Sequence, residues 1–107
     1  MELIENLSKS TIPEEIQETF EPVYNVTRLA GYNGNLYFTA DKIYWVYADY
    51  QHVNLRGWCI SVDEIASYSK RGLAAYRITL KDGKELNFSN VFGKKSKGIT
   101  DAIEKRI

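Results

Sequence analysis

The sequence predicts a mainly β domain of the α+β class, in which about seven antiparallel strands precede one C-terminal helix. Three observations lead to this prediction. Apolar and aromatic side chains alternate with polar ones from Gly34 to Ala48, and Asp82-Gly83 separates two further alternating runs. From Phe92 onward the apolar spacing changes to about 3.6, which is typical of an amphipathic helix, whereas a period of two is typical of a half-buried strand.

The run from Gly34 to Ala48 predicts a hairpin in the middle of the sheet. Its residues alternate on either side of a short polar break at residues 39–42. Aromatic and β-branched residues fit the pleated, half-buried surface of such strands. One alternating set is Leu36, Phe38, Ile43, Trp45 and Tyr47, and the other includes Tyr37, Tyr44 and Val46.

Five more strands complete the predicted sheet, at residues 23–29, 57–62, 65–70, 74–80 and 85–89. In the first of them, Tyr24 and Val26 are expected on the more buried side. Gly31-Tyr32-Asn33-Gly34 contains the Asn-Gly pair that favours a hairpin turn, and Lys81-Asp82-Gly83-Lys84 contains the Asp-Gly pair of a type I′ turn. Residues 49–56 interrupt the alternation, so we expect a loop there.

Residues 1–21 are expected to form an N-terminal extension. Residues 1–10 predict a loosely held lead-in with one helical turn, which would be formed by Leu3, Ile4 and Leu7. Thr11 and Glu14 have the spacing of a capping pair, so a short acidic helix is expected to run from Thr11 until Pro22 ends it. Its apolar stripe would consist of Ile12, Ile16 and Phe20.

The C-terminal helix is expected over residues 92–106. An amphipathic helix must bury its apolar stripe, and the sheet is the large apolar surface left to cover it. We expect Ile99 and Ile103 to make this contact. The stripe consists of Phe92, Ile99, Ala102, Ile103 and Arg106-Ile107.

The composition excludes several classes of protein. The chain has 107 residues, enough for one domain, and its 14 basic and 14 acidic side chains give no net charge. A nucleic-acid-binding domain usually has a basic excess, so no nucleic-acid partner is expected. The first residues do not resemble a signal peptide, and no apolar run approaches the roughly 20 residues that span a bilayer. We expect a cytoplasmic protein, with the membrane periphery as the alternative location.

The sequence contains no recognisable catalytic or metal-binding pattern. Cys59 is the only cysteine and lies in an apolar run, where a buried, inert thiol is expected. His52 is the only histidine, and His52 with nearby Asp49 is too small a set for a metal site or a convincing acid–base pair. We therefore expect no enzymatic activity, no metal and no cofactor.

Three stretches, at residues 34–45 (GNLYFTADKIYW), 60–65 (ISVDEI) and 78–88 (ITLKDGKELNF), resemble motifs of the pleckstrin-homology-like superfamily, especially its GRAM and bacterial branches. The resemblance covers residues 22–107, which would be the domain proper. It implies two bent antiparallel sheets in a split barrel, with the helix plugging one open end. It also implies a binding role, toward proteins or toward lipid headgroups.

Two kinds of partner are therefore expected. A protein partner, or self-association, would use exposed aromatic residues, and the candidates are Tyr32, Tyr37, Tyr44 and Tyr50. An anionic lipid headgroup is the alternative, and its candidate ligands are Lys70, Arg71, Lys94, Lys95 and Arg28. The resemblance implies a basic first hairpin loop for inositide binding, and the neutral Tyr32-Asn33 turn departs from that pattern, which favours the protein partner.

Overall fold

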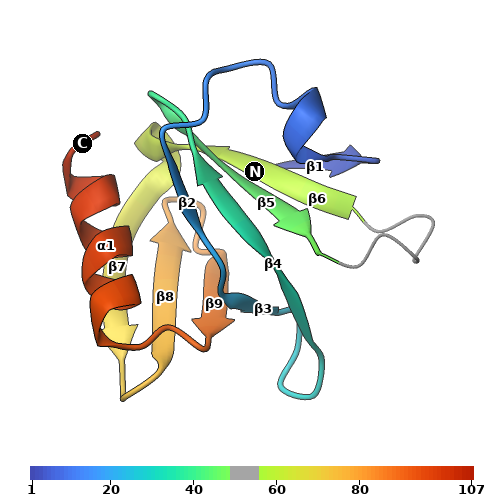
Figure 1. Cartoon of the computed structure of the whole chain (residues 1–107). Helices are drawn as coiled ribbons and strands as arrows, with labels where there is room; N and C mark the ends of the chain where they lie inside the picture. Colours follow the sequence, from blue (N-terminus) through green and yellow to red (C-terminus); the bar gives the residue numbers. More distant parts are fainter. Residues whose placement is uncertain (49–55) are drawn as a thin grey trace.

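The structure is a computed structural model of residues 1–107, and it describes residues 1–48 and 56–107 (Figure 1). The strands are β1 (Glu2–Glu5), β2 (Glu18–Phe20), β3 (Val23–Asn25), β4 (Gly31–Phe38), β5 (Lys42–Tyr47), β6 (Arg56–Ser61), β7 (Ile65–Arg71), β8 (Ala75–Leu80) and β9 (Glu85–Ser89). The helix α1 spans Gly93–Glu104, and two short 3-10 helices, η1 and η2, span Lys9–Thr11 and Val62–Glu64.

The described strands form one antiparallel sheet that bends into two parts (Figure 1). Its order is β1-β6-β5-β4-β3-β9-β8-β7, with β2 added to β4. β4 belongs to both parts, because residues 31–33 pair with β3 and residues 34–38 pair with β5. The predicted mainly β class is confirmed. The sheet has nine strands in place of about seven, and it is open, because β1 and β7 do not pair with each other.

The main core lies between the two parts of the sheet and α1. It is rich in aromatic side chains, and the Tyr24 ring centroid lies 5.5 Å from the rings of Trp45 and Trp58. Ile99 and Ile103 of α1 are fully buried in this core. The predicted packing of the C-terminal helix on the sheet is thus confirmed.

The hairpin turn predicted at residues 31–34 is wrong. These residues open β4 and pair with β3 or β5, and Gly34 allows a close approach, since a Cβ there would lie 2.6 Å from the Trp45 ring. The chain instead reverses at residues 26–30, where the Thr27 hydroxyl accepts hydrogen bonds from two backbone N–H groups. β3 therefore ends at residue 25, and Val26 is exposed rather than buried.

The hairpin turn predicted at Asp82-Gly83 is confirmed, but it is not of type I′. That type requires a positive φ at both central residues. Gly83 has a φ of +91°, whereas Asp82 has no positive φ. The Gly83 N–H donates to the Leu80 carbonyl oxygen at 2.9 Å, as in a type I turn that is followed by a left-handed glycine.

The helix predicted for residues 11–21 is also wrong. Residues 1–17, which we call the N-terminal strap, cross the outer face of β4, β5 and β6 in mostly extended form. β1 pairs with β6, in place of the helical turn expected near the N-terminus, and β2 pairs with β4. Burial alternates from Ile12 to Glu21, because Ile12 and Ile16 pack against the sheet as alternate residues of an extended segment do.

Candidate functional site

The start of α1 lies against the turn between β7 and β8. The Val91 N–H donates to the Ala74 carbonyl oxygen at 2.9 Å, and Figure 1 shows both segments at the same end of the molecule. Lys70 and Arg71 end β7, and Lys94 lies in the first turn of α1. The structure therefore brings three of the predicted basic residues to one end, although they are distant in the sequence.

Two large apolar side chains are exposed at this end. Leu73, in the turn after β7, is 84% exposed, and Phe92 is 58% exposed. The sequence predicted Phe92 on the buried stripe of the helix, but α1 begins at Gly93 and Phe92 is only its N-cap. We call Lys70, Arg71, Leu73, Phe92 and Lys94 the basic tip.

The two sequence segments that form the basic tip contain basic residues but no acidic ones. No acidic residue occurs in residues 65–81 or in residues 86–100, and these two runs hold four and three basic residues respectively. Lys70, Arg71 and Lys94 are all exposed, and none of them forms an ion pair within residues 1–48 and 56–107. Although the net charge of the chain is zero, acidic and basic residues are concentrated in different segments, and six of the 14 acidic residues lie in the first 21 positions.

The other two predicted basic residues have different surroundings. The Lys95 Nζ donates to the backbone carbonyl oxygens of Glu21 and Asn90, at 2.9 and 3.1 Å, so Lys95 ties the start of the helix to the segment before β3. Arg28 lies in the turn at residues 26–30 and lines a separate hollow with residues of β3, β8 and β9. Neither belongs to the basic tip.

The predicted partner-binding tyrosines are mostly covered. Tyr37 and Tyr44 face away from the main core, but the N-terminal strap buries them to 5% and 3% exposure, so the expectation that they are exposed is wrong. Tyr32 is 37% exposed and packs edge-on against Tyr47, with 5.4 Å between the ring centroids. Tyr50 lies outside the described residues.

A polar contact holds the strap over these tyrosines. The Tyr44 hydroxyl donates to the Glu14 Oε2 at 2.7 Å, and the Lys42 Nζ lies 3.2 Å from the Glu14 Oε1. The hydrogen bond from Tyr44 is the main cause that holds the pKa of the Glu14 carboxyl below its usual 4.5. Cys59 is buried in the same cluster, where burial raises the pKa of its thiol and disfavours the reactive thiolate.

Other candidate chemistry leads to no site. Within the described residues, no three His, Cys, Asp or Glu side chains gather as a metal site would require. Among these same residues, no helix has the length and apolarity needed to cross a membrane. Asp49 and His52, which the sequence analysis considered too small a set for a metal site or an acid–base pair, lie outside the described part of the chain.

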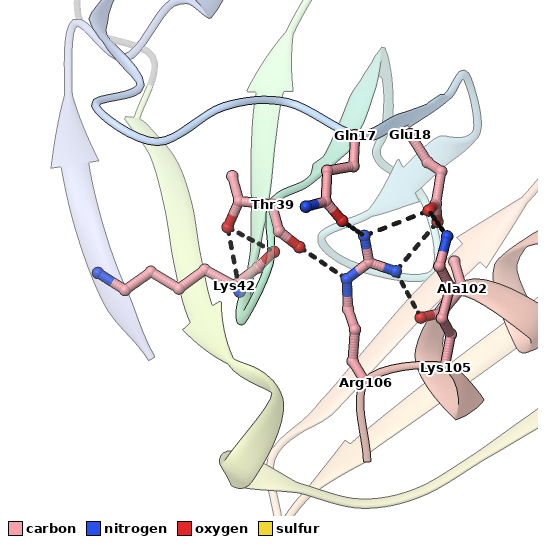
Figure 2. Close-up of polar contacts among 7 residues, drawn as sticks. All are labelled: Gln17, Glu18, Thr39, Lys42, Ala102, Lys105 and Arg106. Carbon is pink, nitrogen blue, oxygen red and sulfur yellow. Dashed lines mark hydrogen bonds and ion pairs between the residues drawn. The ribbon is translucent and has the colours of Figure 1, made fainter.

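A dense polar cluster at the C-terminus was not anticipated from the sequence. Figure 2 shows the guanidinium of Arg106 between Gln17, Glu18, Thr39 and Ala102. It donates five hydrogen bonds, including 2.6 Å to the Thr39 carbonyl oxygen, and lies 5.2 Å from the Phe38 ring centroid. Because its side chain is only 3% exposed and well supplied with acceptors, Arg106 is a structural clamp and not a ligand-binding group.

Comparison with known proteins gives information on the fold and none on the function. No protein-family model matches the chain, and no curated protein matches it. Among solved structures, the chain is similar to the C-terminal domain of an unknown protein from Leishmania infantum, with a TM-score of 0.68 and 16% sequence identity. The similarity covers 86% of this chain and 84% of that one, and at this identity it shows a shared fold alone.

Proposed function

We propose that this chain is a non-catalytic docking module of pleckstrin-homology-like architecture, which binds anionic membrane surfaces through the basic tip. The observation that carries the proposal is the exposure of Leu73 and Phe92 among three cations that have no ion-pair partner in the described chain. Large apolar side chains beside Lys and Arg suit the boundary between headgroups and acyl chains. The bent antiparallel sheet with its C-terminal helix supports the architecture.

The expected affinity is modest and reversible. Each Lys or Arg near an anionic surface contributes about 1 kcal/mol, so three cations supply about 3 kcal/mol. Leu73 and Phe92 add apolar burial when they enter the interface. The electrostatic part should weaken with salt, because exposed charges are screened over about 10 Å at 0.1 M ionic strength.

Vesicle flotation tests this proposal. The protein should float with vesicles of phosphatidylcholine and phosphatidylglycerol, but not with phosphatidylcholine alone, and flotation should fall as salt rises. The double change Lys70→Glu/Arg71→Glu should weaken binding about tenfold or more, since it replaces two attractions by two repulsions. Leu73→Ser/Phe92→Ser should weaken binding while leaving its salt dependence in place.

A matched control is available at the opposite end of β8. Lys81→Glu/Lys84→Glu makes the same change of net charge in the exposed turn between β8 and β9. This variant should retain most of the binding. Equal losses in the two double variants would show non-specific attraction and would overturn the assignment to the basic tip, as would the absence of flotation at low salt.

A protein partner, or a second copy of the chain, is the second candidate, and the edge of β7 favours it. β7 ends the sheet, and no strand in the described part of the chain pairs with its outer side. Such an edge can accept an extended segment through main-chain hydrogen bonds. Light scattering over a range of concentrations, run beside the flotation, separates the two: a stable dimer together with no flotation would support the protein partner.

A further inference from the structure

A second cluster of basic and polar side chains lies outside the basic tip. A hollow of about 480 Å³ opens between the turn at residues 26–30 and the outer face of β3, β8 and β9. Its polar lining consists of Asn25, Thr27, Arg28, Arg77, Asn87 and Ser89, and no carboxylate lines it. We call it the arginine hollow.

The floor of the arginine hollow is a register row of the sheet. Arg77 of β8 pairs with Asn87 of β9, and Asn87 pairs with Asn25 of β3. Paired residues point to the same face, and the neighbours Tyr76, Ile78, Leu86 and Phe88 are buried on the other face. The polar row is therefore held in place by the main core beneath it.

The side chains of the floor are already oriented by one another. The Arg77 Nε donates to the Asn87 Oδ1 at 2.8 Å, and the Ser89 hydroxyl donates to the Asn25 Oδ1 at 3.3 Å. Glu85 lies 3.4 Å from the Arg77 Nε and shares that same edge of the guanidinium. In the described chain, the Nη1 and Nη2 groups of Arg77 have no acceptor.

Arg28 faces the same hollow from the turn. The turn is closed by the Val26 N–H, which donates to the Ala30 carbonyl oxygen at 2.9 Å, and by the two hydrogen bonds to the Thr27 hydroxyl. Arg28 is exposed and has no ion-pair partner among the described residues. Two guanidinium groups with free N–H donors thus meet around one cavity.

We infer that the arginine hollow binds a small ligand that carries a phosphate group. Guanidinium groups present paired N–H donors that match phosphate oxygens, and two of them suit a dianion better than a single carboxylate. The size of the hollow is in the range of small-molecule sites. This inference goes beyond the proposed function, because no residue of the arginine hollow belongs to the basic tip.

The phosphate could belong to a free metabolite or to a lipid headgroup, and two matched probes separate these sources. Glycerol 3-phosphate presents a free phosphomonoester in solution, and vesicles of phosphatidylcholine with phosphatidic acid present the same group on a membrane. Backbone amide chemical shifts in NMR report where glycerol 3-phosphate binds. Flotation of Lys70→Glu/Arg71→Glu, in which two charges of the basic tip are reversed, reports the membrane-bound form.

Glycerol 3-phosphate should shift the amides of Asn25, Arg77, Asn87 and Ser89, relative to a chloride control at equal ionic strength. Arg77→Gln should raise the dissociation constant about tenfold or more, which corresponds to the loss of a charge-assisted contact. Arg28→Gln should have a similar effect, and because Arg28 is exposed in a turn this variant leaves the sheet intact even if Arg77→Gln proves unstable. Lys81→Gln is the matched control and should bind as the wild type does.

The outcomes decide the source and the site. Shifts confined to the hollow without tip-independent flotation indicate a soluble ligand, and flotation on phosphatidic acid that Arg28→Gln abolishes indicates a headgroup. Three outcomes would each overturn the inference. The chemical shifts could change at all exposed lysines, or at no residue beyond the chloride control. The third outcome is an equal affinity for glycerol 3-phosphate in both arginine variants and in Lys81→Gln.

Discussion

Two apolar clusters share the strands β4 and β5, and they differ in what covers them. The main core holds Trp45, Trp58 and the buried face of α1, and it is closed by the rest of the sheet. The second cluster lies on the opposite face of the same strands and includes Tyr37 and Tyr44 under the N-terminal strap. Adjacent residues of β5 therefore belong to different clusters. The hairpin of β4 and β5 is covered on one face by the main core and on the other by the N-terminal strap.

The two clusters also differ in chemistry. The main core consists mostly of apolar and aromatic side chains, and its two largest members, Trp45 and Trp58, are almost completely buried. The second cluster mixes apolar groups with two phenols and a thiol, and the Glu14 carboxylate accepts a hydrogen bond from one of the phenols. A hollow of about 500 Å³ remains beside this cluster, between the strap and Lys42. Truncating a side chain in the main core should therefore lower the free energy of unfolding more than truncating one in the second cluster.

The largest effect is expected from Ile103→Ala in the main core. Ile103 has no exposed surface and joins α1 to the sheet, so its truncation leaves a cavity that the rigid strands cannot fill. The free energy of unfolding should fall by about 4 kcal/mol, in the upper part of the range for such changes. Urea or thermal unfolding measures it, and an unchanged transition midpoint would contradict the packing described here.

Ile12→Ala is the matched control in the second cluster. Ile12 belongs to the strap and packs into the second cluster, and its neighbours Thr11 and Pro13 line the hollow, so its truncation should lower the free energy of unfolding by about 2 kcal/mol or less. The thiol of Cys59, which is buried in that cluster, should become accessible to a thiol reagent while the far-UV circular dichroism stays native. If the Cys59 thiol reacted as fast in Ile103→Ala as it does in Ile12→Ala, the two clusters would open as one cooperative unit.

The same comparison shows what the sequence can predict. The hairpin formed by β4 and β5, the strands from β6 to β9 and the packing of α1 follow from local alternation, because each segment covers one continuous core. The sequence predicts a helix in place of the extended segment from residue 11 to β2, because Ile12, Ile16 and Phe20 lie at a spacing of four, which satisfies both a helical period and a strand period. Glu14 and Glu18 occupy the half-buried positions between these apolar residues, where their carboxylates form ion pairs. Because charged residues are expected on the solvent side of a strand, the alternation of burial is not visible in the sequence.

The candidate sites show a similar limit. Charge alone identified Lys70, Arg71 and Lys94, but their meeting with Leu73 and Phe92 depends on the contact between Val91 and Ala74, which no local pattern encodes. The arginine hollow depends likewise on the register of the three strands β3, β8 and β9. The alternation in the sequence does predict that Arg77 and Asn87 face outward, because both lie between apolar residues of their strands.

An intermediate effect is expected from Arg106→Ala, which acts where the strap joins the main body. The change removes five hydrogen bonds and leaves the carbonyl oxygens of Thr39 and Ala102 without this donor. The cost should be about 2 kcal/mol rather than more, because Glu18 keeps its ion pair with Lys105 at 2.8 Å. Chemical denaturation measures it.

Arg106→Lys serves as the control for charge. Lysine keeps the positive charge but cannot reach Gln17, Glu18 and Thr39 at once with a planar fork of donors. This variant should therefore lose most of the stability that Arg106→Ala loses. Full stability in Arg106→Lys would mean that charge, and not the hydrogen-bond geometry, is what holds α1 to the strap.

The smallest effect is expected from Glu14→Gln, and it should depend on pH. The hydrogen bond from Tyr44, together with Lys42, lowers the pKa of Glu14 from its usual 4.5 in the folded protein. A carboxyl with a lowered folded pKa adds stability above its unfolded pKa and loses it as the pH falls through the folded value. The wild type should therefore be more stable than Glu14→Gln at neutral pH, by less than about 1 kcal/mol, and the difference should shrink as the pH falls below 4.5 and vanish below the lowered pKa of the folded protein. Urea unfolding of both proteins at several pH values measures it, and Glu15→Gln, at the exposed neighbouring position, should match the wild type at neutral pH. A difference that persists unchanged in acid would mean that Glu14 acts through the packing of its side chain over the second cluster and not through its charge.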